Sequence, residues 1–131
     1  MKKISIEELC SLTICDLKVC SISFDSNESI TISLNGEKSI DISLCCGKCE
    51  LILIKGYEVL NQQEEVVFDM PDVEILGSEI IPAIENLVNS EPHAVDFSAK
   101  DNKLVLNVCD ESDTYELYFD CSDVLISDDC K

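Results

Sequence analysis

The residues that come closest to a chemical motif are the cysteines of segment 45–49, which reads Cys-Cys-Gly-Lys-Cys. Cys46 and Cys49 are separated by two residues, and a turn at that spacing can bring both sulfurs to one zinc ion. A structural zinc site takes four ligands, yet the chain has no second Cys-x-x-Cys pair. Further ligands would have to come from the other cysteines: Cys10, Cys15, Cys20, Cys109, Cys121 and Cys130.

A zinc-stapled, cysteine-rich accessory or assembly subunit is therefore an alternative that the sequence leaves open. The simpler expectation is that the nine cysteines are reduced thiols, several of them small core residues. We accordingly expect no metal and no cofactor. A thioredoxin-like redox motif is disfavoured, because that motif opens a helix, whereas the residues after Cys49 have the pattern of a strand.

Other groups suited to catalysis lack a motif around them. His93 is the only histidine, and no serine or cysteine stands in a recognisable nucleophile motif, so we expect a surface or strand-edge imidazole. The acidic residues of 110–129 lack the ordered spacing of an EF-hand loop, and the four glycines form no phosphate-binding motif. A small hydrolase that pairs two carboxyl groups in the fold stays open, but the sequence favours a protein that is not an enzyme.

Charge gives the clearest functional signal. The 131 residues include 27 Asp and Glu but only nine Lys and no Arg, for a formal net charge of −18. Residues 62–131 hold 18 of the acids and three of the lysines, so this half carries −15. Nucleic acids and anionic membranes would be repelled, because their recognition needs clustered basic residues. A basic protein would be attracted.

The chain is expected to fold as a single domain over residues 1–131. Its 46% hydrophobic content argues against disorder, and no repeat or linker divides it. A helix and a first β meander would occupy 1–62, and a strand, a helix and an acidic β meander would occupy 63–131. No apolar run reaches the roughly 18 residues of a membrane span, and no signal peptide is recognisable, so we expect a cytoplasmic protein.

In the first half, Ser5 and Glu8 have capping-box spacing, which predicts a helix over about 5–12. Alternating apolar residues then predict three antiparallel strands: Cys20, Ile22 and Phe24; Ile30, Ile32 and Leu34; Ile40, Ile42 and Leu44. Setting Ile32 opposite Ile40 leaves a three-residue loop at 35–37. Residues 51–54 are expected to form a more fully buried strand.

In the second half we expect a strand over 66–70 and a helix over 78–89. The helix would carry its apolar residues on one side, Ile80, Ile81, Ile84, Leu87 and Val88, and its regular part would begin near Ile81 because of Pro82. An Asp101-Asn102 turn then joins two strands. The predicted pairs are Val95 with Val108, Phe97 with Leu106, Ala99 with Leu104, Val108 with Tyr115, Leu106 with Leu117, and Leu104 with Phe119. The fold class is α+β: mostly antiparallel β, in two meanders, with two short helices.

The opposite face of the second meander is the predicted binding surface. Val105 and Tyr118 would lie side by side among acids, with Lys103 across from Asp120, an arrangement that resembles a hot spot for a basic partner. The predicted contact residues are Asp96, Val105, Asn107, Glu116, Tyr118 and Asp120. A solvated face, or one covered by a helix, is the alternative.

The sequence thus predicts a non-enzymatic, acidic binding or inhibitor protein that occludes a basic, nucleic-acid-binding partner, such as a nuclease or a CRISPR-type effector. By charge and size alone the chain resembles immunity proteins, phage-encoded inhibitors and DNA mimics. An acidic protein whose charge serves only solubility is the competing interpretation.

Overall fold

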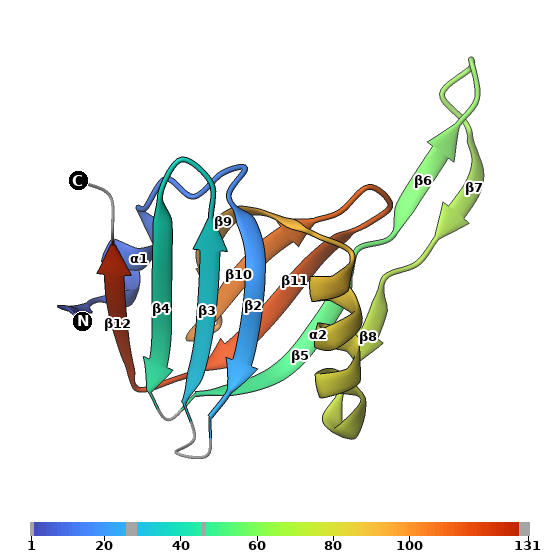
Figure 1. Ribbon diagram of the computed structural model, residues 1–131. Coiled ribbons are helices and arrows are strands. Elements are labelled where there is room, and N and C mark those ends of the chain that lie inside the picture. The colour runs from blue at the N-terminus through green and yellow to red at the C-terminus, as the bar shows by residue number, and fades with distance from the viewer. Residues whose placement is uncertain (1, 26–28, 46, 129–131) are drawn as a thin grey trace.

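The computed structural model describes residues 2–25, 29–45 and 47–128 (Figure 1). In this part of the chain the elements are β1 (Lys2–Ile4), α1 (Ile6–Cys10), β2 (Lys18–Phe24), β3 (Ile30–Asn35), β4 (Ser39–Cys45), β5 (Lys48–Ile54), β6 (Tyr57–Leu60), β7 (Val66–Met70), β8 (Val73–Ile75), a 3-10 turn (Gly77–Glu79), α2 (Ile80–Asn89), β9 (His93–Lys100), β10 (Lys103–Cys109), β11 (Thr114–Asp120) and β12 (Asp123–Asp128). The fold class is α+β and mostly antiparallel β, as expected.

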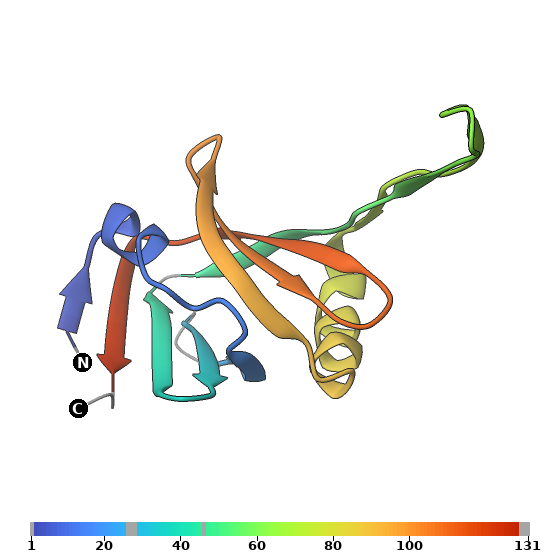
Figure 2. The same ribbon diagram turned by 90° about the horizontal axis from the view of Figure 1, so that it is seen from above.

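Both meanders belong to one antiparallel sheet, in the order β1-β12-β4-β3-β2-β9-β10-β11-β5-β8. The halves meet where β2 and β9 pair only at Lys18 and His93. Bonds just outside that pair extend the junction: the Val19 N–H donates to the Pro92 carbonyl at 2.9 Å, and the Ala94 N–H donates to the Leu17 carbonyl at 2.7 Å. The sheet bends there, so that β2, β3, β4 and β12 lie in front of β9, β10 and β11 (Figures 1 and 2).

The hydrophobic core fills the space between the two halves of the bent sheet. Alternate residues of both meanders form one continuous buried cluster, because a strand turns every second side chain to the same face. The predicted inward residues of β3 and β4 have at most 1% of their surface exposed: Ile30, Ile32, Leu34, Ile40, Ile42 and Leu44. In the second meander, Leu104, Leu106, Leu117 and Phe119 are equally buried.

The two helices also contribute to this core. In α1 the Glu8 N–H donates to Ser5 Oγ at 3.0 Å and the Ser5 N–H donates to Glu8 Oε1 at 3.3 Å, which confirms the capping box. α2 begins at Ile80, so Pro82 lies in the first turn, where a missing N–H breaks no helical bond. α2 contacts β2 and β5, which come from opposite halves of the sheet.

The predicted pairing of β3 with β4 is wrong by two residues. Ile32 lies opposite Ile42, and the loop is 36–38 instead of 35–37. The loop is closed by the Gly36 N–H, which donates to the Lys38 carbonyl at 3.0 Å, and by Ser39 Oγ, which donates to Asn35 Oδ1 at 3.0 Å. A shift of two keeps every side chain on its face, so the hydrophobic pattern does not distinguish the registers.

Bulges overturn two further expectations. Cys20 lies at a bulge in β2 and is exposed instead of pointing into the core. In β9 the register shifts so that Val108 faces Ala94 instead of Val95; Ala94 is buried, whereas Val95 is 40% exposed. The other predicted pairs of β9, β10 and β11 are confirmed, and Asp101 and Asn102 have φ values of 50° and 65°, as a tight turn requires.

Three smaller expectations about burial are also wrong. Phe24, at the end of β2, is 38% exposed, and Ile81 in α2 is 50% exposed. β5 is less buried than expected: within 51–54 only Ile52 is buried. The position of β5 next to the edge strand β8 explains this, because little of the sheet lies beyond it.

The strand expected at 66–70 belongs to a feature that the sequence analysis missed. It is β7, which pairs with β6 in a separate two-stranded sheet; we call residues 57–70 the arm. The arm leaves the body from the ends of β5 and β8 and extends away from it in both views (Figures 1 and 2). It therefore presents nearly its whole surface to solvent.

Candidate functional site

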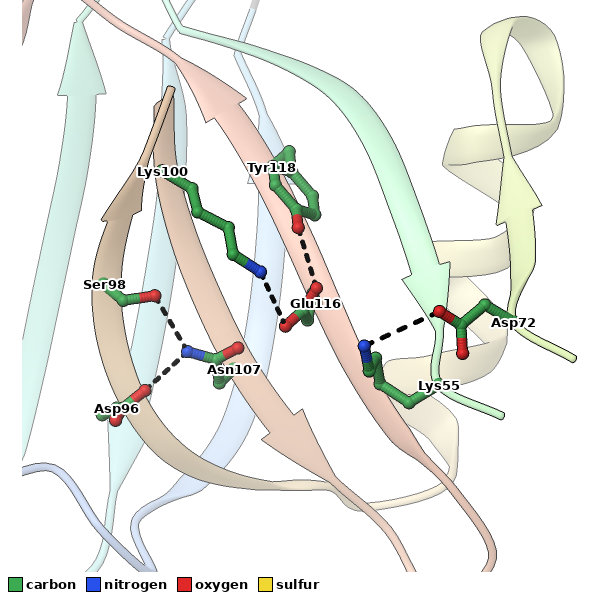
Figure 3. Close-up of polar contacts among 8 residues, drawn as sticks. All are labelled: Lys55, Asp72, Asp96, Ser98, Lys100, Asn107, Glu116 and Tyr118. Carbon is green, nitrogen blue, oxygen red and sulfur yellow. Dashed lines mark hydrogen bonds and ion pairs between the residues drawn. The ribbon is translucent and has the colours of Figure 1, made fainter. Parts of the chain in front are cut away.

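The six residues predicted to bind a partner do meet on one surface. They lie on the side of β9, β10 and β11 that faces away from the core, which we call the outer face. Figure 3 shows four of them: Asp96, Asn107, Glu116 and Tyr118. Asn107 lies between Asp96 and Glu116, and Val105 lies opposite Tyr118, as the predicted register requires. The role of this face in binding remains a prediction.

Val105 is not accessible on the outer face. Its exposed fraction is 0%, although it lies on the opposite side of β10 from Leu104 and Leu106 and outside the core cluster. Its cross-strand neighbours are Ser98 and Tyr118. The expected aliphatic and aromatic pair is therefore present, but only Tyr118 offers any surface to a partner, which corrects the prediction for Val105.

The polar groups of the outer face are largely satisfied by one another. Asn107 Nδ2 donates to Asp96 Oδ1 at 2.6 Å and to Ser98 Oγ at 3.2 Å (Figure 3). The Tyr118 hydroxyl donates to Glu116 Oε1 at 2.8 Å, and Lys100 Nζ lies 3.6 Å from the other oxygen of Glu116. This network spans β9, β10 and β11 and links side chains across the face.

Titration of these groups reflects the same contacts. Burial, followed by the hydrogen bond to Glu116, raises the pKa of Tyr118. Interaction with Tyr118 and with Glu116 raises the pKa of Lys100. Both shifts favour a protonated tyrosine beside a charged lysine, so Glu116 is a paired carboxylate rather than a free one.

A second lysine neutralises the end of the outer face. Lys103 Nζ lies 2.9 Å from Glu50 and 3.5 Å from Asp120, and the hydrogen bond to Glu50 is the main cause of its raised pKa. The sequence predicted the contact of Lys103 with Asp120 but not the roles of Lys100 and Glu50. The outer face is consequently less acidic than its carboxylates alone suggest.

The carboxylate of Asp110 stabilises local structure. It accepts hydrogen bonds from the N–H groups of Ser112 and Asp113, both at 2.8 Å, and from the hydroxyls of Tyr115 at 3.0 Å and Ser90 at 3.1 Å. Burial acts to raise its pKa, but these bonds outweigh burial and lower it. Asp110 thus ties α2 to the turn between β10 and β11.

Of the two cysteines in the Cys-x-x-Cys pair, the structure describes only Cys49. Cys49 is 6% exposed in the core, and burial raises its pKa to about 12, so it is a protonated thiol. Cys46 lies outside the described residues. Within the described ranges no three His, Cys, Asp or Glu side chains are close enough to hold a metal ion. His93 is exposed, as expected.

The arm carries a distinct set of accessible side chains. Tyr57 pairs with Met70 and Val59 pairs with Phe68, which places all four on one face of the ribbon. Each is between 40% and 50% exposed, and the rings of Tyr57 and Phe68 lie 5.9 Å apart. We call these four residues the apolar face of the arm.

The opposite face of the arm combines acidic and apolar side chains. Glu58 and Asp69 lie directly opposite one another, and next to them Leu60 pairs with Val66, each 52% exposed. Glu64 and Glu65 follow at the tip.

The arm lies within a longer segment, 56–99, that contains ten acidic residues and no lysine. All ten are exposed. Asp72 pairs with Lys55 and Glu91 pairs with Lys18, and the other eight carboxylates form no ion pair among the described residues.

The base of the arm is held by close contacts. Lys55 Nζ lies 3.6 Å from Asp72 (Figure 3). The Asp72 carboxylate also accepts a hydrogen bond from the Gly56 N–H at 2.5 Å. These contacts, that from Gly56 first, lower the pKa of Asp72 although burial acts to raise it. A Cβ at Gly56 would lie 2.0 Å from the Met70 carbonyl, so only glycine fits where the two ends of the arm come together.

No protein-family model, curated protein sequence or solved structure matches the chain. Among the described helices, none has the length and apolar composition needed to cross a membrane. Inferences about function therefore depend on the chemistry of this chain's own surface.

Proposed function

We propose that this chain is an acidic binding protein that inhibits a basic, nucleic-acid-binding protein by covering its cationic surface. One observation carries the proposal. Of the twelve large hydrophobic side chains exposed among the described residues, eleven lie within the lysine-free segment 56–99. Eight of the ten carboxylates of this segment form no ion pair among the described residues, so exposed apolar surface and largely unpaired negative charge occur in the same segment.

The two properties have complementary effects on association. The carboxylates accelerate the encounter with a cationic surface and disfavour anionic partners, because long-range electrostatics act before contact. The apolar side chains then supply the contact area that affinity requires. Acidity that served only solubility would give no reason to collect exposed hydrophobic residues in the same segment.

The proposal gives the outer face a secondary role. Asp96 and Asp120 are exposed there and Tyr118 is half-buried, so these residues can extend an interface. We place the protein in the cytoplasm, where nine cysteines would remain reduced and where nucleases and CRISPR-type effectors act. Direct binding of nucleic acid is not part of the proposal.

Purification from the native cells tests the proposal. The tagged full-length chain is captured at low salt and eluted with a salt gradient, and the released proteins are identified and assayed for nucleic-acid binding with and without the chain. We expect a basic protein that elutes at high salt and loses nucleic-acid binding when the chain is added. A retained partner that is acidic, or whose binding does not weaken with salt, would overturn the proposal.

A matched pair of variants separates the two surfaces. Glu116→Gln, Tyr118→Ser and Asp120→Asn together remove two negative charges from the outer face, and Glu58→Gln with Asp69→Asn removes two from the arm. If charge in segment 56–99 attracts the partner, the second set weakens capture more than the first. Equal capture by both sets and by the unchanged chain would contradict electrostatic recognition.

A further inference from the structure

We propose that the arm is the element that anchors the partner: its apolar face inserts into an apolar groove on a basic protein, and its carboxylates pair with cations at the groove's rim. This rests on the proposed function and assigns it to one element. The inference follows from the shape, exposure, charge and rigidity of the arm.

The apolar face has no partner within the described chain. Tyr57, Val59, Phe68 and Met70 form two adjacent cross-strand pairs, all substantially exposed. Two-stranded ribbons are marginal in water unless their apolar side chains are covered, and contiguous exposed apolar surface marks interaction sites. β6 spans four residues, so a groove about 13 Å long would accommodate the paired side chains.

Charge identifies the occupant as basic. Glu58 and Asp69 are directly opposed like charges, which destabilises a two-stranded ribbon in isolation. The nearest lysine in the sequence, Lys55, is already paired with Asp72. A cation from a partner would relieve this repulsion. A second copy of the arm would add to it, and so would a nucleic acid or an anionic membrane.

The arm is preorganised at both ends. At the tip, Asn61 Oδ1 accepts bonds from the N–H groups of Gln63 at 2.9 Å and Glu65 at 3.0 Å, and the Asn61 N–H donates to the Glu65 carbonyl at 3.0 Å. At the base, Gly56 allows the backbone to approach Met70 and Pro71 closely. An ordered ribbon loses less conformational entropy on binding than a loop would.

Photo-crosslinking in the native cells tests the arm directly. The variants Phe68→p-benzoylphenylalanine on the arm, Phe24→p-benzoylphenylalanine at the end of β2 and Tyr118→p-benzoylphenylalanine on the outer face are made in the full chain. Phe24 is the matched control because it is an exposed phenylalanine outside segment 56–99. We expect position 68 to give an adduct with a basic protein, and position 24 to give little or none.

The outcomes separate the two proposals. A basic protein that crosslinks at position 118 but not at 68 would overturn the role of the arm and leave the proposed function standing. An adduct of position 68 with a second copy of the chain, or flotation of the chain with phosphatidylserine vesicles, would overturn the inference of a basic partner. The absence of a basic protein from all three positions would overturn both proposals.

A binding measurement with the crosslinked protein completes the test. Val59→Ser with Phe68→Ser should weaken affinity about tenfold or more, whereas Phe24→Ser, outside segment 56–99, should change it by less than about twofold. The unfolding midpoint of the arm variant should stay the same, because the arm lies outside the core. Unchanged affinity in a folded arm variant would contradict the inference.

Discussion

At the scale of single residues, burial separates structural side chains from accessible ones. Val105 has no exposed surface, Cys49 has little, and Asp110 is occupied by four hydrogen-bond donors. Val105 was predicted to contact a partner, and cysteine and aspartate are residue types that often serve in metal binding or catalysis. Their environments in this fold assign them to stability, and three predictions follow from that assignment.

Val105→Thr should reduce the free energy of unfolding by about 1–2 kcal/mol, because the shape is conserved while a hydroxyl is buried in place of a methyl group. The same change at Val73, which is 47% exposed, should matter by less than about 0.5 kcal/mol. Urea unfolding of both variants measures the difference. A Val105→Thr chain of full stability would show that this site is open to water.

Cys49 should resist alkylation in the folded protein at pH 8, because its pKa of about 12 leaves almost no thiolate. Cys15 and Cys20 are exposed and should react first. Timed labelling with iodoacetamide, read by peptide mass spectrometry, compares the three thiols. Labelling of Cys49 as fast as Cys20 would contradict the burial of Cys49. Metal analysis of the same preparation tests the zinc alternative.

Asp110 should contribute to the acid sensitivity of the fold. Its folded pKa is below the ordinary value of 3.8, so its stabilisation is present above the unfolded pKa and is lost as the pH falls through the folded one. From about pH 4 down to about pH 2, the free energy of unfolding should therefore fall less steeply in Asp110→Asn than in the unchanged chain. Parallel slopes in urea titrations would exclude this contribution.

At the scale of elements, the arm and the bent sheet are held in place by different contacts. Strands in the sheet are positioned by a buried face, whereas the arm contributes no residue to the core and is positioned by its base and tip. Its geometry should therefore be sensitive to small changes at the base. The core should tolerate the same changes, because it is formed by other residues.

Gly56→Ala should loosen the arm without unfolding the body. The new Cβ would lie 2.0 Å from the Met70 carbonyl and 2.6 Å from the Pro71 carbonyl carbon, so the strands must separate. Faster amide exchange in 57–70, with unchanged exchange in β3 and β4, is the expected result. Gly77→Ala is a control in open space, although its φ of 61° adds local strain. Unaltered amide exchange in the arm would show that its base can accommodate the added methyl group.

At the scale of the whole molecule, charge opposes folding and favours a cationic partner. A formal charge of −18 on 131 residues places carboxylates close together, and the described ion pairs engage only part of them. Repulsion between the remaining carboxylates is weakened by salt. The same screening should weaken binding to a basic protein, so stability and affinity are expected to respond oppositely.

The thermal unfolding midpoint should therefore rise as NaCl increases from about 10 mM to about 300 mM, because screening reduces repulsion among the carboxylates. Calorimetry or circular dichroism measures this shift. The variant Glu58→Gln, Glu65→Gln and Asp69→Asn should show a smaller rise. A midpoint that falls with salt would show that the ion pairs outweigh the repulsion.

The sequence by itself determined the local features of the fold. Alternation assigned the inward residues of β3 and β4, because a strand repeats every two residues. Capping spacing located α1, and Pro82 located the start of α2. The two-residue turn at Asp101 and Asn102 also determined the register of β9 with β10 up to the bulge, because such a turn allows only one register.

The tertiary structure alone decided which polar and apolar side chains remain accessible. Bulges exposed Cys20 and Val95, and the pairing of β5 with β11 brought Glu50 within reach of Lys103. The alternation of apolar residues at 66–70 fits a core strand and the arm equally well, because a repeat of two residues shows only that one face of the strand is apolar. Whether other residues cover that face depends on contacts between distant segments of the chain. No described segment packs against the apolar face of the arm.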